Sequence, residues 1–431
     1  MTSMRSALVM ALGLTACASS GGITDHPPGT TDPDFGSYPG AEPDVAAPLV
    51  IDGLEPGWLV TTTTLADGRM PVDATVVSDG SPITVAATDG TRAFAAVTGG
   101  DGAVIATQTV LAACSPRSPQ LHVPAQYPTI QAAVNAAHPG DTITVAPGRY
   151  TETVIMKQGV CLLGSGASRT ILDGRGEART LVDLSIAPGS TVSGFTFRGT
   201  TGNGGCATDD VYQCSGNWYR AGIFVSGEGL GGEVPGYDPA QKWSGPSQKS
   251  PALIYGNLFE DNDIGVMLNY HGIGVVRNNV FVGNRSALVA NHFDDHTLVA
   301  NNVFIDNAQL AIGNDAAYLD IIANAIVGSD VAIHFQYIQN GAIRCNLFFH
   351  NGADQTDLFD VPPRFTIGKD GNLDVDPRFA NLDPRIAGAS DYHLAPGSPG
   401  VDRGCFGDHE PDGTPYDLGV YGGPLGQSIS L

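Results

Sequence analysis

A repeat with a period of about 22 residues runs through the middle of the chain and constrains its fold more than any other feature. Five segments share one pattern: NLFEDN from Asn257, NVFVGN from Asn279, NVFIDN from Asn302, NAIVGS from Asn324 and NLFFHN from Asn346. The steps between the leading asparagines are 22, 23, 22 and 22 residues. A period of this length is typical of stacked units, each of which buries its apolar face only against its neighbours.

Two apolar positions recur in these units. Three residues before a leading asparagine lie Val276, Val299, Ile321 and Ile343, and two residues after it lie Phe259, Phe281, Phe304, Ile326 and Phe348. An offset of five residues would place the two sets on opposite faces of a flat strand. Both sets have the composition of a core, so the chain must turn between them, and asparagine tolerates the left-handed backbone of such a turn. Stacked rungs about 4.8 Å apart would let the asparagine amides form a hydrogen-bonded ladder.

The N-x-F-x-x-N units resemble the β-helix repeats of the pectin-lyase-like superfamily. The flanking sequence extends the likeness to about residues 121 to 425. The resemblance implies an all-β chain whose main part is a right-handed parallel β-helix, with three short strands in each coil of about 22 residues. The handedness is implied by the resemblance alone. It implies little about activity, because one scaffold carries many different sites.

Residues 1–17 are predicted to be a lipoprotein signal peptide and not part of the fold. The apolar run from Ala7 to Leu14 is too short to span a bilayer. The sequence Leu14-Thr15-Ala16-Cys17 looks like a bacterial lipobox, which implies lipidation of Cys17, and an ordinary secretory signal with an incidental cysteine is the alternative. Ala18 after this cysteine implies, by family analogy, an exported protein anchored in the outer membrane, facing either the periplasm or the cell surface.

Composition divides the remaining chain into four parts. Residues 18–45 are rich in Gly, Pro, Asp, Ser and Thr and are predicted to be a disordered linker. Residues 46–113 alternate short apolar runs with Gly/Asp turns, which is typical of a small Ig-like β-sandwich. Residues 121–370 are predicted to form the β-helix, with a short helix after Thr129 closing its apolar end. The period fails after the fifth unit, and residues 371–431 are predicted to be a closing segment.

The acidic balance restricts the partners. A net charge of −23 argues against binding nucleic acid and disfavours polyanionic substrates unless cations bridge. We therefore expect the partner to be a neutral or cation-bridged glycan. We also expect a monomer that contacts the membrane only through its lipid. The spacing of Asp370, Asn372 and Asp374 imitates a calcium loop but lacks the downstream glutamate. Turn chemistry is the favoured interpretation, so calcium stays possible without a specific motif, and no metal ligands are assigned.

The cysteines other than Cys17 indicate disulfides, because their number is even in an exported chain. Cys206 and Cys214 are close enough in sequence to bridge one loop. The pairing of the other four stays open at this point: Cys114, Cys161, Cys345 and Cys405.

Two long loops interrupt the regular pattern, at about residues 199–219 and 226–251. They contain Trp218, Tyr219 and Trp243. Aromatic rings in exposed loops suit stacking on sugar rings. The equally weighted alternative is that these rings pack the loops onto the solenoid.

Two polar sets follow the repeat and give the candidate site. Twelve residues after the leading asparagines come Asn269, Asn291, Asn314 and Gln336, and at the next position come Tyr270, His292, Asp315 and Tyr337. Successive rungs would bring Tyr, His and Asp within reach of one another, with His292 or Tyr270 as general base and Asp315 orienting it. The alternative is an external asparagine ladder followed by solvated turn residues.

The extra residue of the 23-residue step lies in the segment after Asn291. It is expected to bulge the turn there and to bring Asp294, Asp295 and His296 nearby.

Motifs of familiar enzymes of the superfamily are missing. The order of His271-Gly272 and Asp294-Asp295, without a following Arg-Ile-Lys, does not fit polygalacturonases, and the Gly-x-x-Asp-Phe-Ile-Phe-Gly stretch of pectinesterases is absent. The expected function is action on polysaccharide as a lyase or hydrolase. The alternative is a non-catalytic carbohydrate-binding or adhesion protein, so whether the chain is an enzyme stays open.

Overall fold

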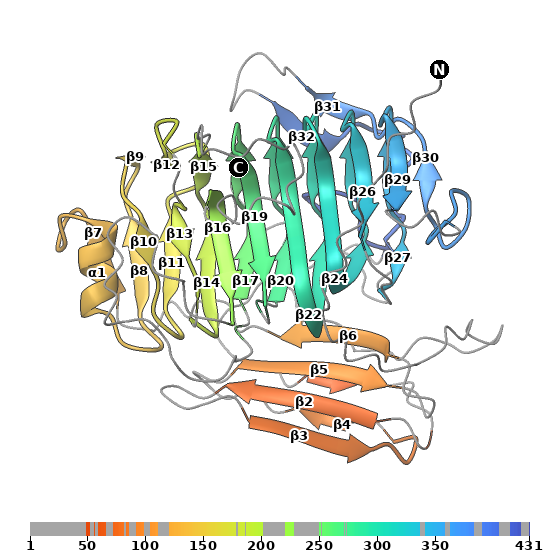
Figure 1. Cartoon of the computed structure of the whole chain (residues 1–431), viewed down its shortest axis with the longest axis horizontal. Coiled ribbons are helices and arrows are strands. Elements are labelled where there is room, and N and C mark those ends of the chain that lie inside the picture. Colours follow the sequence, from red (N-terminus) through yellow and green to blue (C-terminus); the bar gives the residue numbers. More distant parts are fainter. Residues whose placement is uncertain are drawn as a thin grey trace, which may run out of the picture.

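Two long sheets run side by side along one axis of the computed structural model and form a parallel β-helix (Figure 1). One sheet has 15 strands and the other has nine. Pairing joins equivalent residues of successive coils: Phe259 pairs in parallel with Phe281, and Phe281 with Phe304. The predicted all-β parallel β-helix is therefore confirmed.

The structure describes residues 49–51, 56, 59–65, 72–81, 83–85, 92–98, 104–110, 120–177, 180–185, 187–200, 220–227, 250, 252–270, 272, 274–336, 341–357, 363–382, 390–404, 414–423 and 431. The 15-stranded sheet contains β7 (Gln120–Val123), β8 (Thr142–Val145), β10 (Val154–Ile155), β11 (Cys161–Gly164), β13 (Val182–Asp183), β14 (Ser190–Ser193), β16 (Ala221–Ser226), β17 (Ala252–Tyr255), β19 (Ile264–Asn269), β20 (Gly274–Arg277), β22 (Ser286–Ala300), β24 (Leu310–Ile322), β26 (Val331–Phe335), β27 (Ile343–Arg344) and β29 (Ala353–Asp357). The nine-stranded sheet contains β9 (Gly148–Tyr150), β12 (Thr170–Asp173), β15 (Thr196–Arg198), β18 (Leu258–Glu260), β21 (Val280–Val282), β23 (Val303–Ile305), β25 (Ala325–Val327), β28 (Leu347–Phe349) and β30 (Leu373–Asp374).

The leading asparagines form the predicted ladder at the turn between the two sheets. Each Nδ2 donates to Oδ1 of the asparagine on the next coil at 3.0–3.1 Å. The ladder runs through Asn257, Asn279, Asn302, Asn324, Asn346 and Asn372, and all six are buried. Asn372, from the segment whose spacing imitates a calcium loop, is thus the last rung of the ladder and serves the turn.

The left-handed residue of each turn is not the leading asparagine but the residue before it. That position holds Gly256, Asn278, Asn301, Ala323 and Cys345, with φ between 53° and 63°. The leading asparagine instead fixes the turn with its side chain, because its Nδ2 also donates to backbone carbonyls such as Val276 O from Asn302. The sequence pattern indicated the turn correctly but assigned the left-handed backbone one residue too late.

The apolar repeat builds a stacked core. The rings of Phe197, Phe259, Phe281 and Phe304 lie on one another with centroids 4.7–5.1 Å apart. Val276, Val299 and Ile321 face the same interior and are buried. Both predicted apolar columns therefore meet inside the solenoid.

Each end of this core is covered. At the first coils, helix α1 (Ile130–Ala136) buries Ile130, Ala133 and Val134, and Thr129 caps its N-terminus, as predicted. At the last coils, Phe365 stacks on Phe348 with ring centroids 4.9 Å apart.

From β18 onward the outer face of the nine-stranded sheet carries a row of apolar residues, which C-terminal residues from 390–404 and 414–423 cover. Leu258, Val280, Val303 and Leu347 of successive strands join one buried cluster with Tyr392, Leu418 and Val420. Asn278 Nδ2 donates to the carbonyls of Val420 and Gly422 at 2.7 and 2.6 Å. β32 (Asp391–Leu394), which belongs to this covering part, forms an antiparallel pair with β31 (Phe379–Asn381) just before it in the sequence.

Ahead of the solenoid, two small antiparallel sheets form where short strands were expected. One has the order β3 (Val72–Val77), β2 (Leu59–Leu65), β5 (Arg92–Thr98), β6 (Val104–Val110), and the other pairs β1 (Leu49–Ile51) with β4 (Ile83–Val85). No helix in the described part of the chain is long and apolar enough to cross a membrane.

Candidate functional site

A row of polar side chains occupies one position on four successive strands of the 15-stranded sheet. Ser226 of β16 pairs with Asn269 of β19, Asn269 with Asn291 of β22, and Asn291 with Asp315 of β24. We call these four residues the polar column. All four are buried, and Asn291 Nδ2 donates to Asn269 Oδ1 at 2.7 Å. The residues just before them, such as Leu268 and Ala290, face the interior core, so the polar column lies on the outer face.

The neighbouring position on the same outer face is apolar. Phe224, Met267 and Val289 pair in register two residues before the polar column and belong to one buried cluster. The change from apolar to polar side chains therefore occurs at the carboxyl end of β16 and β19, whereas β22 and β24 continue past this position. His334 of β26 occupies the same register position as Val289, because both pair with Gly313 of β24. Its Nδ1 contacts Thr356 Oγ1 at 2.8 Å.

Tyr270 lies in the turn directly after the polar column. Its backbone is left-handed, with φ of 33°, and its side chain is 39% exposed. Its N–H donates to Asn291 O at 3.1 Å, and its carbonyl accepts from Gly227 N at 2.7 Å. Two hydrogen bonds thus hold this exposed aromatic residue between two coils.

One predicted polar set is out of register at its third member. Asn314 pairs with Ala290 and Phe335 and therefore stands in the interior column of Leu268, while Asp315 takes the place beside Asn291. The cause is an extra residue in the opposite turn: Asn284 and Asn307 are 23 residues apart, but Ser286 and Leu310 are 24 apart. Gln336 follows Phe335 as Asp315 follows Asn314, so it continues the polar column.

The predicted irregularity after Asn291 is present. In the pairing of β22 with β24, Phe293 is opposite Ala317 and His296 is opposite Tyr318, so Asp294 and Asp295 have no register partner. The backbone places His292 one residue beyond the polar column, whereas Asp315 is in it. Tyr270, His292 and Asp315 are thus not on one column, and the side chains of residues 292–296 lie outside the description.

Several predicted residues lie outside the described part of the chain. They are Cys17, Cys206, Cys214, Trp218, Tyr219, Trp243, His271 and Tyr337. The first aromatic loop leaves after Thr200 and returns at Arg220, where Thr200 Oγ1 donates to Arg220 O at 3.0 Å. The second loop begins after Gly227, whose backbone N–H donates a hydrogen bond to the carbonyl of Tyr270.

Asp183 of β13 is a buried carboxyl that the repeat pattern did not reveal. It pairs with Phe224 and is 1% exposed. Oδ1 accepts from Ser185 N at 2.8 Å, while Oδ2 has no hydrogen-bond partner among the described residues. Burial raises the pKa of Asp183 to about 6. Its only sequence signal is an aspartate between Val182 and Leu184, in a coil that lacks the N-x-F-x-x-N pattern.

Asp183 and Asp315 do not form a catalytic pair. Four strand steps separate β13 from β24, which is about 19 Å at about 4.8 Å per step. Paired glycosidase carboxylates lie within about 10 Å of one another. Asp183 and Asp315 therefore cannot act together on one glycosidic bond.

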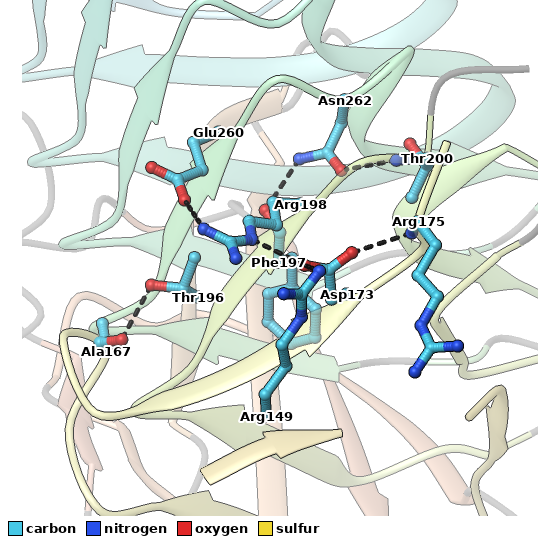
Figure 2. Close-up of polar contacts among 10 residues, drawn as sticks. All are labelled: Arg149, Ala167, Asp173, Arg175, Thr196, Phe197, Arg198, Thr200, Glu260 and Asn262. Carbon is cyan, nitrogen blue, oxygen red and sulfur yellow. Dashed lines mark hydrogen bonds and ion pairs between the residues drawn. The ribbon is translucent and has the colours of Figure 1, made fainter. Parts of the chain in front are cut away.

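A second polar group lies on the outer face of the nine-stranded sheet (Figure 2). Arg149 Nη2 and Arg198 Nε both contact Asp173 Oδ2, at 2.6 and 2.8 Å, and Arg198 Nη1 contacts Glu260 at 3.3 Å. The backbone N–H of Arg175 donates to Asp173 Oδ1 at 2.8 Å. We call Arg149, Asp173, Arg175, Arg198 and Glu260 the arginine cluster. The sequence pattern did not indicate it, because all its members except Glu260 precede the regular repeat.

The ionisation of the arginine cluster follows from its contacts. Burial alone would raise the pKa of Asp173, but the hydrogen bonds from Arg198 and Arg175 N and the charges of Arg198 and Arg149 hold that pKa below its usual value. Burial raises the pKa of Glu260 despite its hydrogen bond from Arg198. Asp173 is thus the firmly ionised anchor of the cluster.

A family comparison covers the coils that carry the polar column, together with Arg198 and Glu260 of the arginine cluster. Residues 176–357 match the family model described as "Periplasmic copper-binding protein (NosD)". The match spans 182 of the 431 residues, under half of the chain. Comparison with curated proteins finds no match.

Solved β-helix structures show weak similarity. The chain is 14% identical to the PL6 family alginate lyase AlyGC, with a TM-score of 0.31, over 57% of this chain and 41% of that one. It is 11% identical to pectin methylesterase PemA from Erwinia chrysanthemi, with a TM-score of 0.22, over 56% of this chain and 81% of that one. The chain thus spans about two fifths of the lyase. At these scores the resemblance carries no argument about activity.

Proposed function

We propose that this protein is an exported β-helix protein that binds polysaccharide beside Tyr270 and the polar column. The observation that supports this is an exposed aromatic ring held at the end of an outer row of hydroxyl, amide and carboxyl groups. A flat ring stacks on a sugar ring. Because the polar column is buried, Tyr270 is the group that a ligand meets first.

The two aromatic loops are proposed to extend this site. Gly227, the last described residue before the second loop, is hydrogen-bonded to Tyr270. The loops carry Trp218, Tyr219 and Trp243, whose rings suit further stacking on sugars.

Catalysis as a lyase or hydrolase is a narrower proposal on the same residues. His292 or Tyr270 would take the proton, and Asp315, one register position away from His292, would orient the base or the substrate. The competing proposal is an adhesion protein that holds glycan without cleaving it. Asp315→Asn separates the two, because it removes the carboxylate and keeps the shape.

Binding is tested with full-length protein on a glycan array, followed by affinity measurement and reducing-sugar release on the hits. Tyr270→Ala is expected to weaken binding about tenfold, roughly 1.4 kcal/mol of lost stacking. Leu382→Ala is the matched control, since Leu382 is similarly exposed at 37% on the C-terminal segment. Unchanged affinity in Tyr270→Ala would overturn the proposed site. Turnover lost in Asp315→Asn with binding retained supports an enzyme, and binding without turnover in the unaltered protein supports adhesion.

Export and anchoring rest on the N-terminal signal, and the matched family is described as periplasmic. We propose that Cys17 carries the lipid that fixes the protein to the outer membrane. Cys17→Ala is expected to move the protein from the membrane fraction to the soluble fraction of the cell envelope, with the fold unchanged.

Copper is not part of this proposal. Among the described residues, no three His, Cys, Asp or Glu side chains gather into a possible metal site. The residues present in the described coils therefore do not fit the metal named in the family description, and no step is assigned to it.

A further inference from the structure

The outer face of the nine-stranded sheet changes character along the solenoid. From β18 onward it carries a row of apolar residues, which the C-terminal segment covers through Tyr392, Leu418 and Val420. Ahead of that cover it carries the arginine cluster, with Arg149, Asp173 and Arg198 on β9, β12 and β15, Arg175 just after β12, and Glu260 at the end of β18. Arg149 keeps 56% of its side chain exposed, and Arg175 is exposed as well. This part of the sheet therefore presents charge to the outside.

Positive charge exceeds negative charge in the cluster. Three guanidinium groups face two carboxyl groups, in a chain whose net charge is −23. Arg149 and Arg198 share a single oxygen of Asp173. The side chain of Arg175 makes no hydrogen bond or ion pair with any described residue. Since a guanidinium has five N–H donors, most of those on Arg149 and Arg175 are unused by the described chain.

The buried carboxylate of Asp173 holds the arginine cluster in place. Asp173 is 3% exposed and fixes Arg149 through Oδ2 and the backbone of Arg175 through Oδ1. Arg175 has a left-handed backbone, with φ of 57°. Figure 2 shows the side chains of Arg149 and Arg175 on either side of Asp173, with the guanidinium of Arg175 turned away from it.

We propose that Arg149, Arg175 and Arg198 bind the carboxylate or sulfate groups of a linear acidic polysaccharide. The planar guanidinium fork matches an oxyanion with two parallel hydrogen bonds. The three arginines come from three successive coils, at register positions that differ: Arg149 pairs with Ile171, and Arg198 pairs with Asp173. They therefore present donors at more than one point of the surface, which suits a polymer that carries several anionic groups. The overall negative charge repels polyanions at long range, but screening limits that repulsion to about 8 Å at physiological salt. This site is separate from the polar column and does not depend on the proposed function.

The test measures binding of full-length protein in about 0.15 M NaCl, where long-range repulsion is screened. The probes are polygalacturonate for carboxylate, dextran sulfate for sulfate, and dextran as the uncharged polymer. Binding to one or both charged polymers is expected, and the preferred one identifies the oxyanion. Arg175→Gln is expected to weaken this binding several-fold, and Arg149→Gln with Arg175→Gln at least tenfold.

Arg403→Gln is the matched control, because Arg403 is exposed on the C-terminal segment, away from the cluster. Tyr270→Ala tells this site from the proposed one: loss of charged-polymer binding in Tyr270→Ala but not in the double arginine variant would place the polymer at Tyr270 and overturn the proposal. Folding of each variant is checked by thermal unfolding, and Arg175→Gln removes no side-chain contact to the described chain. Equal affinity of the double variant and the unaltered protein would overturn the proposal. So would failure to bind either charged polymer, or equally tight binding to dextran.

Discussion

Single buried side chains carry hydrogen bonds for more than one coil. Asn302 Nδ2 donates to Val276 O and Asn324 Oδ1, and its Oδ1 accepts from both N and Nδ2 of Asn279. The residue is fully buried. Asn302→Leu leaves these partners unsatisfied, so the free energy of unfolding should fall by roughly 1 to 3 kcal/mol. Urea unfolding measures this, with exposed Asn381→Leu as a control expected to stay within about 0.5 kcal/mol.

Asp183 makes stability depend on pH. Burial raises its pKa from 3.8 to about 6, so the folded state holds its proton more tightly than the unfolded state. The contribution of the protonated carboxyl to the free energy of unfolding is fully present below about pH 4 and is lost as the pH rises through about 6. The free energy of unfolding changes by about 3 kcal/mol between these limits. Asp183→Asn cannot ionise and keeps an acceptor for Ser185 N. The variant should melt higher than the unaltered protein at pH 7.5 and nearly the same at pH 4. A constant difference at both pH values would contradict this account.

At the scale of elements, the repeat predicts what successive coils share and fails where one coil differs. The asparagine ladder and the phenylalanine stack follow from the period, because identical residues stack in a parallel sheet. The predicted position of Asn314 was wrong because one residue is added between Asn307 and Leu310. This addition shifts the register of β24 against β22 by one residue, and the spacing of the leading asparagines does not reveal it. Asp183 and the three arginines of the arginine cluster lie in coils without the pattern. Spacing alone could not place them on a face.

The same stacking decides which cysteines can pair. Cys161 and Cys345 are the two described cysteines, and both are buried. From β11 to β27 the sheet takes six strand steps, about 29 Å, whereas the Cα atoms of a disulfide lie within about 7 Å. They therefore cannot bond to each other. We expect Cys161 to pair with Cys114, which shortly precedes β7, and Cys345 with Cys405, which follows Gly404. Cys206 would then pair with Cys214. Non-reducing peptide mapping checks all three, and any exchange of partners would contradict the assignment.

For the whole molecule, the C-terminal segment covers an apolar outer face of the solenoid that would otherwise be exposed to water. Leu418 is 1% exposed and packs in the cluster with Val303 and Leu347, and Gly419 N donates to Ala323 O at 2.9 Å. Leu418→Asp buries a charge there and should release residues 414–423 from the sheet. Hydrogen exchange should then speed up at Leu418 to Gly422, while the amides of the nine-stranded sheet stay protected by their own ladder. Leu382→Asp, at an exposed leucine, should change neither the exchange at Leu418 to Gly422 nor the exchange in the nine-stranded sheet. Loss of protection throughout the sheet would show instead that the coils and their cover unfold as one unit.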